Sequence, residues 1–204
     1  MAFEINCDAK EGPTLKEKHV KIAEAAAALF VEKGFHNTSI REIAKACGMS
    51  MGNLYHYIKS KDDVLFLVYQ EVYWNWEENL RAVEKKEIHD PEKKLKALVQ
   101  AMLKSVYENK DHIQMTFRES KFLEKSALKN VLAIESQFIE VFVKLIEEGV
   151  QKGVFRKVDP KIIGNLIAYN MFFYPLRGWY FRGKVELESI EAQIVDFIMH
   201  GLVK

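Results

Sequence analysis

The chain of 204 residues is 49% hydrophobic, 12% aromatic and 29% charged, and its formal net charge is +1. This composition excludes a disordered or polybasic chain and fits a globular protein with one small and one larger domain. The longest apolar stretch, near residues 166–176, is too short to span a membrane and contains Asn170 and Pro175, so we expect a cytoplasmic protein.

The first predicted element is a helix that follows a flexible tail of residues 1–14. Its apolar positions are Ile22, Ala26, Leu29 and Phe30, and it ends near Gly34. A short second helix begins at Ser39, because Ser39 and Glu42 have the spacing of a capping box, in which each side chain satisfies a backbone N–H at the helix start. The apolar residues of this second helix are Ile40, Ile43, Ala44 and Cys47.

A glycine turn and a third helix follow at once. Gly48 stands where the second helix must stop, and glycine tolerates the left-handed backbone of such a turn. Ser50 is a suitable N-cap for a helix that carries Met51, Gly52, Asn53, Leu54 and Tyr55. Leu54 and Ile58 are expected to face inward, which leaves the small and polar residues outward. The pattern predicts a DNA-reading helix-turn-helix over residues 38–61.

The side chains of this segment suggest two kinds of DNA contact. Hydroxyls, a helix N-terminus and an ammonium group bind phosphates, so the phosphate candidates are Thr38, Ser39, Tyr55, Tyr57 and Lys61. The start of the third helix is expected to lie toward base edges, with the candidates Ser50, Met51, Gly52 and Asn53. Asn53 can pair with adenine or with a phosphate. An alternative for Tyr55 is a buried ring that holds the three helices together.

The charge of the N-terminal part is low for a DNA-binding domain. Residues 1–61 contain nine Lys and Arg against seven Asp and Glu, a net charge of +2. Affinity that depends on neutralising phosphates needs more cations than this. We therefore expect two copies of the chain to bind together, and we expect binding to weaken with added salt.

The segment from about Lys16 to Leu65 resembles the N-terminal domain of the tetracycline-repressor-like (TetR) family. The residues that carry the resemblance are Leu29 to Phe35, Thr38-Ser39-Ile40, Ile43-Ala44, Gly48 to Tyr57 and Ser60-Lys61. The chain departs from the usual pattern at Cys47, Met49, Met51 and Ile58. Met51 can touch a thymine methyl but cannot make a bidentate guanine contact, which leaves the target sequence open. The resemblance implies a DNA-binding domain over residues 15–62 and a ligand-binding and dimerisation domain over residues 63–204.

The pattern after Lys61 stays helical. Further helices are predicted from residue 62 to beyond residue 81 and over residues 90–106, 111–122, 126–152, 159–175 and 186–202. Asp90-Pro91 and Asp159-Pro160 each combine an N-cap with a proline at the first helical position. Pro175 is expected to bend or end its helix. With three N-terminal helices the count is about nine, and the predicted fold class is all-α.

The resemblance also implies a homodimer. In the TetR family the last two helices of two chains pack as a four-helix bundle, which corresponds to residues 159–202; the alternative is that these helices only close the core of one chain. Recognition helices about 34–36 Å apart read successive major grooves, so the implied partner is a palindromic double-stranded DNA operator. An effector that tilts the long helix beginning at Lys61 would change that separation, and repression is the usual habit of the family.

The larger domain is rich in aromatic residues, which favours a large apolar small-molecule effector, although most of the rings are expected to be core. Residues 117–123 and 176–180 are similar to those of TetR regulators of fatty-acid and acyl-CoA metabolism. The candidate effector residues are Trp76, Tyr107, Phe117, Arg118, Phe138, Phe142, Phe173 and Arg177. Arg118, Arg177 or Arg182 would meet a carboxylate or the phosphates of coenzyme A, or would only cover surface charge. The rival is a multidrug-type regulator that binds aromatic cations through Glu119 or Glu135.

The sequence contains no catalytic signature. A glycine-rich phosphate loop, a nucleophile elbow and a His-x-x-x-His pair are missing, and the six histidines are scattered. Cys7 and Cys47 have neither disulfide nor metal spacing. We therefore expect no enzyme activity, no cofactor and no metal. A helical interaction module without DNA binding is the remaining class, but it would not need the hydroxyl-rich set of Thr38, Tyr55 and Tyr57.

Overall fold

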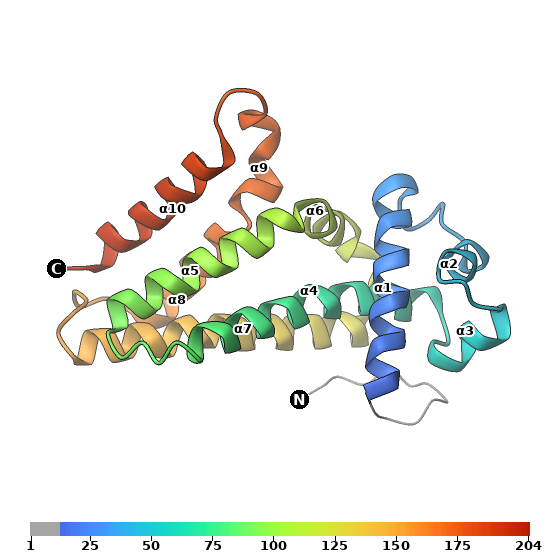
Figure 1. The fold of residues 1–204 in the computed structure, drawn as a ribbon, viewed down its shortest axis with the longest axis horizontal. Helices are drawn as coiled ribbons and strands as arrows, with labels where there is room; N and C mark the ends of the chain where they lie inside the picture. Colours follow the sequence, from blue (N-terminus) through green and yellow to red (C-terminus); the bar gives the residue numbers. More distant parts are fainter. Residues whose placement is uncertain (1–12) are drawn as a thin grey trace. The chain divides into compact units, whose positions relative to one another are not determined.

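A computed structural model describes residues 13–204, and this part of the chain folds into ten α-helices and one short 3₁₀-helix (Figure 1). No strand is found in these residues beyond an isolated bridge, so the prediction of an all-α fold is confirmed. None of the described helices is long and apolar enough to cross a membrane. The predicted tail of residues 1–14 lies outside the described residues except for Pro13 and Thr14, which begin α1 (Pro13–Lys33), and Cys7 lies outside them too.

The described chain forms two compact units. Unit 1 contains the residues up to Trp74 together with Asp111–Ala133, and unit 2 contains Asn75–Lys110 and Ile134–Lys204. The long helices α4 (Lys61–Glu84) and α7 (Lys125–Gln151) each contribute residues to both units.

Unit 1 is organised around α1, α2 (Ile40–Ala46) and α3 (Met51–Tyr57), which pack against one another (Figure 1). Helices of seven residues are too short to be stable alone, so burial against α1 and α4 must hold α2 and α3 in place. The same apolar core includes residues of α6 (Lys110–Glu119) and of the start of α7. Its fully buried side chains include Ile22, Phe30, Ile43, Leu54, Ile58, Leu65 and Leu67.

Local hydrogen bonds fix the ends of α2 and α3. The Ser39 hydroxyl accepts the backbone N–H of Glu42 at 3.2 Å, and the Glu42 carboxylate accepts the backbone N–H of Ser39 at 2.8 Å. Gly48 has a φ of +64°, the left-handed conformation that favours glycine. The Ser50 hydroxyl accepts the N–H of Asn53 at 3.2 Å. These contacts confirm the predicted capping box, glycine turn and N-cap.

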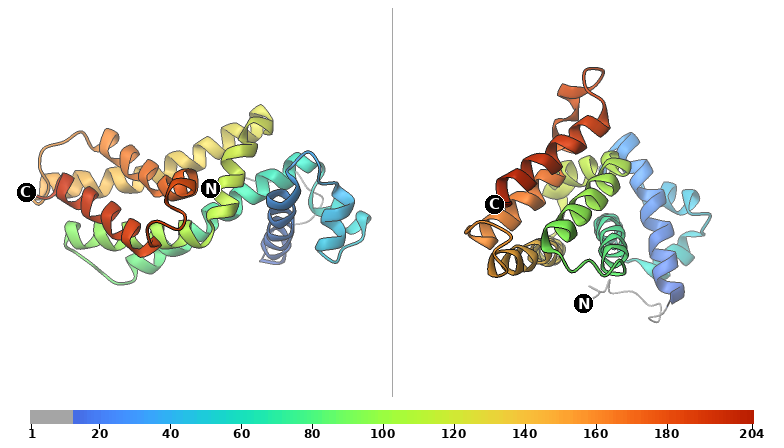
Figure 2. Two further views of the ribbon diagram at one scale, coloured as in Figure 1. Left: turned by 90° about the horizontal axis from the view of Figure 1, so that it is seen from above. Right: turned by 60° about the vertical axis from the view of Figure 1, so that its left-hand side comes forward.

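Unit 2 is a bundle in which α5 (Pro91–Glu108) contacts α8 (Pro160–Met171), α9 (Phe173–Phe181) and α10 (Leu187–Leu202). Figure 2 shows α10 running beside α5. The predicted aspartate caps are confirmed, because Asp90 accepts one backbone N–H and Asp159 accepts two, and each precedes a proline in the first turn. The largest fully buried side chains of the unit include Leu95, Leu98, Met102, Phe142 and Phe155.

Helix α9 was not predicted, and it raises the number of helices from about nine to ten in the described residues. Pro175 was expected to bend or end a helix, but it lies in the first turn of α9. The backbone N–H groups of the first helical turn have no intrahelical acceptor, so a proline there removes no hydrogen bond. Helix α8 ends earlier, at Met171.

Candidate DNA interface and effector site

Helix α3 presents a small, polar face to solvent. Ser50, Gly52, Asn53 and Tyr55 are exposed, whereas Leu54 on the opposite side is fully buried. A Cβ atom built on Gly52 meets nothing within 4 Å, so this position leaves open space for a base edge or backbone to approach. Met51 is half-buried and packs against the core of unit 1. The structure thus places the four predicted base-reading residues at the N-cap and first turn of α3, with Met51 the least exposed.

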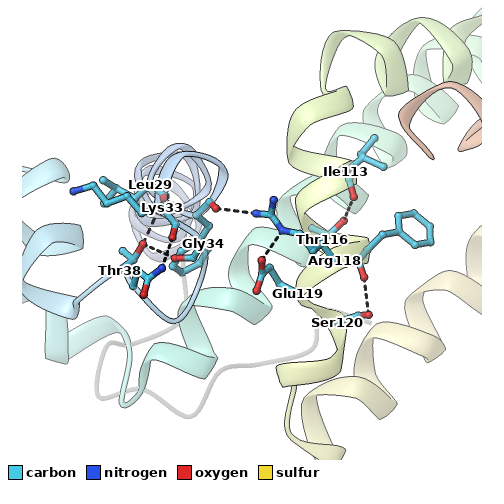
Figure 3. A network of polar contacts seen from close by, with 12 residues as sticks. Leu29, Lys33, Gly34, Thr38, Ile113, Thr116, Arg118, Glu119 and Ser120 are labelled. Atoms are coloured by element: carbon cyan, nitrogen blue, oxygen red, sulfur yellow. Dashed lines mark hydrogen bonds and ion pairs between the residues drawn. The ribbon is translucent and has the colours of Figure 1, made fainter. Parts of the chain in front are cut away.

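The predicted phosphate contacts of Thr38 and Lys61 are not what the structure shows. The Thr38 side chain is buried, and its hydroxyl donates to the carbonyls of Gly34 at 2.9 Å and Leu29 at 3.4 Å (Figure 3). The reason is local: Gly34 directly follows the last residue of α1, so its carbonyl has no intrahelical donor and accepts the Thr38 hydroxyl instead.

Lys61 also satisfies carbonyls of the turn between α1 and α2. Its ammonium donates to the carbonyl oxygens of Phe35 at 2.8 Å, Thr38 at 3.1 Å and His36 at 3.3 Å, and it lies 4.4 Å from the centre of the Phe35 ring. An ammonium group has three N–H donors, and these contacts use all of them. Lys61 therefore holds the turn that precedes α2 instead of presenting a free charge.

The remaining phosphate candidates keep exposed surface. Ser39 is exposed, although its hydroxyl also donates to the Glu42 carboxylate at 2.8 Å. Tyr55 is 43% exposed, so the alternative of a buried ring is wrong, while Tyr57 is half-buried. The buried His19 ring forms a hydrogen bond of 3.1 Å with the Tyr57 carbonyl, and burial lowers the pKa of His19. Ser39 and the two tyrosines stay predicted DNA contacts.

An ion pair braces α2 beside these residues. The Lys33 ammonium donates to the Glu42 carboxylate at 2.8 Å, and this bond, together with the Ser39 N–H and hydroxyl, lowers the pKa of Glu42 to about 2. Glu42 thus stays ionised at physiological pH, where it links α1 to the capping box of α2.

Helix α6 and the following η1 (Ser120–Phe122) join unit 1 through Arg118 (Figure 3). The Arg118 Nε pairs with the Glu119 carboxylate at 2.7 Å, and its Nη2 donates to the Phe30 carbonyl of α1 at 3.3 Å. The ring of Phe122 lies 3.9 Å from that of His36, centre to centre.

A second hydrogen bond holds α6 to α4, because the Tyr69 hydroxyl of α4 donates to the Thr116 carbonyl of α6. The last turns of α6 are therefore packed and hydrogen-bonded to the helices that carry α2 and α3.

The candidate effector residues divide between the two units. Trp76 of α4 stands edge-on to Phe138 of α7 at 5.1 Å between ring centres, and Phe138 stands edge-on to Phe142 at 5.3 Å, which makes a row of three rings inside unit 2. Tyr107 of α5 is buried against Tyr174 of α9 at 5.3 Å.

The other four candidates are not part of this row. Phe117 and Arg118 belong to unit 1, where Arg118 is engaged by Glu119 and Phe30. Phe173 packs against Phe181 on α9 itself, and Arg177 is exposed beside Trp179. The contacts of Arg118 therefore do not fit its predicted role as an effector ligand.

Unit 2 contains buried polar groups that the sequence alone does not identify as such. The Trp76 Nε1 and the Tyr107 hydroxyl are buried without a hydrogen-bond partner. Burial, followed by the charge of Glu191 and by Tyr174, raises the pKa of Tyr107. Burial also raises the pKa of Glu135. Glu191 was missed because its position depends on how α10 packs on α5, which no local motif reports.

The described residues indicate neither a metal site nor a reactive thiol. Within residues 13–204, no group of His, Cys, Asp or Glu is placed to hold a metal ion. Cys47 is a free thiol in the core of unit 1, and burial raises its pKa. A buried thiol of raised pKa is a poor nucleophile.

A helix-turn-helix with an exposed polar reading face, followed by a larger helical bundle with an aromatic interior, defines a DNA-binding transcriptional regulator. Residues 22–68 match the family of bacterial regulatory proteins named tetR, and residues 89–202 match the C-terminal domain of tetracyclin repressor-like proteins. The chain belongs to the TetR family and is a transcriptional regulator, not an enzyme.

Several characterised proteins are similar along nearly the whole chain. The transcriptional repressor KstR2 of Rhodococcus jostii (strain RHA1) is 24% identical over 191 residues, which cover 91% of this chain and 91% of KstR2. The fatty acid metabolism regulator protein of Bacillus subtilis (strain 168) is 21% identical over 193 residues, covering 92% and 96% of the two chains. The crystal structure of AibR in complex with isovaleryl coenzyme A and operator DNA has a TM-score of 0.72 at 24% identity, covering 88% of this chain and 97% of AibR.

Proposed function

We propose that the protein is a homodimeric repressor that acts in the cytoplasm, binds a palindromic operator, and leaves it when a large apolar effector of the fatty acid or acyl-CoA class binds. The observation that carries the proposal is the row of rings formed by Trp76, Phe138 and Phe142 inside unit 2, in a chain whose α3 presents a polar reading face. The B. subtilis relative named for fatty acid metabolism and the AibR complex with isovaleryl coenzyme A support this class of effector.

The DNA contacts are proposed to divide by exposure. Ser50, Gly52 and Asn53 are exposed at the start of α3 and would face base edges, with Met51 touching a thymine methyl at most. Ser39, Tyr55 and Tyr57 would donate to phosphates, while Thr38 and Lys61 would act indirectly by holding the turn before α2.

Dimerisation is proposed through α8 and α10. Each has a buried face within unit 2, and each also exposes large apolar side chains on another face: Ile162 is 60% exposed, Leu166 52%, Tyr169 65% and Phe197 72%. Large exposed apolar side chains that form a contiguous patch mark protein–protein interaction sites in soluble proteins. Closing one chain's own core leaves these side chains uncovered, so a second copy of the chain is the better occupant.

The multidrug alternative is weaker. Glu119 is already paired with Arg118, and it belongs to unit 1. Glu135 lies on α7, but burial raises its pKa and so disfavours the carboxylate that a cation would need. An apolar acyl chain requires no such counter-charge.

The effector signal is proposed to travel along α4 and α6. Helix α4 carries Trp76 in the aromatic row and Lys61 at the turn before α2. Helix α6 holds α1 through the bond from Arg118 to the Phe30 carbonyl. A shift of either helix would move α3, and a symmetric pair of α3 helices tolerates little change in spacing on DNA.

The test is fluorescence anisotropy with labelled double-stranded DNA from the region upstream of the protein's own gene. We expect salt-sensitive binding by a dimer and release on adding palmitoyl-CoA or isovaleryl-CoA. A ligand at one hundred times its dissociation constant should also stabilise the protein by about 2.7 kcal/mol in a thermal-shift assay. Absence of binding to this upstream DNA at low salt would overturn the proposal that the protein represses its own gene region. Absence of any effect of an acyl-CoA would overturn the proposed class of effector.

A further inference from the structure

Two polar side-chain atoms in unit 2 are buried but unpaired. Buried polar groups in folded proteins nearly always have hydrogen-bond partners, because an unpaired one has lost its water without replacement. Among the described residues, the Trp76 Nε1 on α4 and the Tyr107 hydroxyl on α5 are the two buried side-chain atoms without a partner. Trp76 belongs to the aromatic row that the proposed function assigns to the effector, and Tyr107 belongs to the same unit. A bound ligand would supply the hydrogen-bond partners that these two atoms lack.

The chemistry of the two atoms restricts the ligand. The indole N–H is a donor only, and a phenol that keeps its proton is a donor as well. Burial and the neighbouring Glu191 raise the pKa of Tyr107, so the hydroxyl keeps its proton throughout the physiological range. A complementary ligand must therefore bring hydrogen-bond acceptors. An aromatic cation, which brings positive charge and few acceptors, leaves both donors unpaired.

The surroundings of Tyr107 restrict the acceptor further. Its ring lies 5.3 Å from that of Tyr174, centre to centre, and the nearby charge comes from Glu191 of α10, which has Glu188 and Lys104 among its own charged neighbours. A free carboxylate at the Tyr107 hydroxyl would meet Glu191 with the same sign of charge. A neutral carbonyl would accept the hydrogen bond without that repulsion.

We propose that Tyr107 is a specificity-determining residue that donates a hydrogen bond to a neutral carbonyl of the effector, as in an acyl thioester or ester, and that Trp76 donates to a further acceptor along the aromatic row. This assignment rests on the proposed function, because it takes the effector to enter unit 2. It separates activated acyl groups, which carry a neutral carbonyl, from free fatty acids and from cations. The apolar chain would lie against the rings of Phe138 and Phe142.

The assignment is tested by pairs of ligands that differ at the carbonyl group. Palmitoyl-CoA and isovaleryl-CoA are compared with their thioether analogues, S-hexadecyl-CoA and S-isopentyl-CoA, in which a methylene replaces the carbonyl, and methyl palmitate is compared with free palmitate. Isothermal titration calorimetry on the wild-type protein should give about tenfold tighter binding for the thioester that fits than for its thioether, as expected for one hydrogen bond to an otherwise unpaired buried donor. Free palmitate should bind more weakly than methyl palmitate, whose ester carbonyl is neutral.

The variant Tyr107→Phe removes the hydroxyl and keeps the ring. Because that hydroxyl has no partner in the free protein, the variant should melt at the same temperature as the wild type or higher, which separates a binding role from a structural one. Its preference for the thioester over the thioether should disappear. Tyr180→Phe, which removes an exposed hydroxyl from α9, is the matched control and should keep the preference.

The outcomes distinguish the two levels of inference. If the wild type binds an acyl-CoA but binds its thioether equally well, or if Tyr107→Phe keeps the thioester preference, the carbonyl contact is wrong while the proposed effector class stands. If the wild type binds neither acyl-CoA nor fatty acid, the proposed effector class fails and the carbonyl contact fails with it.

Discussion

Replacing Arg118 by methionine should destabilise the protein because it leaves the Glu119 carboxylate without its ion-pair partner. The Arg118 side chain is 55% exposed, whereas that of its partner Glu119 is only 7% exposed. Without the guanidinium, Glu119 would be a nearly buried carboxylate with no opposite charge, and the Phe30 carbonyl would lose the donor that comes from α6.

The magnitude follows from the burial of the two partners. Removing one partner of a fully buried ion pair costs about 3–5 kcal/mol. Because water can partly replace the exposed guanidinium, we expect about 1–2 kcal/mol for Arg118→Met. For a chain of this size, about 1 kcal/mol lowers the melting temperature by roughly 2–4 °C, so the expected loss is roughly 2–8 °C.

The assay is thermal unfolding followed by circular dichroism at one fixed protein concentration, since the proposed dimerisation would make the transition concentration-dependent. The control is Lys152→Met, which breaks an ion pair with Glu148 of similar length whose side chains are 50% and 44% exposed. That exposed pair should contribute about 0–1 kcal/mol. The double variant Arg118→Met/Glu119→Gln should recover part of the loss, because the stranded charge is gone. Equal melting of Arg118→Met and Lys152→Met, or a double variant no more stable than the single one, would refute the reasoning.

Three further predictions concern DNA, assembly and pH. Asn53→Ala should weaken operator binding by about tenfold in anisotropy and leave non-specific DNA binding nearly unchanged; an equal loss on both would show that Asn53 binds only phosphate. Phe197→Glu should yield a folded monomer by analytical ultracentrifugation, since Phe197 is 72% exposed in the single chain, and a persistent dimer would exclude α10 from the interface. Burial, together with the nearby Glu24, raises the pKa of Glu71 from 4.5 to about 7, so its ionisation opposes folding increasingly as the pH rises from 4.5 to 7. Glu71→Gln should therefore melt above the wild type at pH 8 and with it near pH 4.5; a gain of equal size at both pH values would contradict this cause.

Features set by neighbouring residues could be predicted from the sequence. Ser39 with Glu42, Gly48 and Ser50 act within one helical turn, and Asp90 and Asp159 precede prolines directly, so their roles do not depend on the rest of the fold. The apolar positions of α2 and α3 followed for the same reason. Even so, Pro175 was misjudged, because the sequence does not say whether a proline lies inside a helix or in its first turn.

Features set by contacts between distant residues could not be predicted. Thr38 and Lys61 are predicted phosphate contacts because hydroxyl and ammonium groups bind phosphates, yet both side chains donate to carbonyls of the turn between α1 and α2. One of the two partners of Arg118 is a backbone carbonyl 88 residues away, which no side-chain pattern reveals. The unpaired state of the Tyr107 hydroxyl is likewise a property of packing among α5, α9 and α10.

The bonds of Lys61 also bear on how the two helices of the helix-turn-helix open and close. They join residues 23 to 26 positions apart in the chain, and the loop that they close contains both α2 and α3. Neither helix is long enough to persist alone, so fraying of one removes the support of the other and releases the ammonium from its carbonyls. The backbone amides of α2 and α3 should therefore exchange with solvent deuterium together, as one cooperative opening unit.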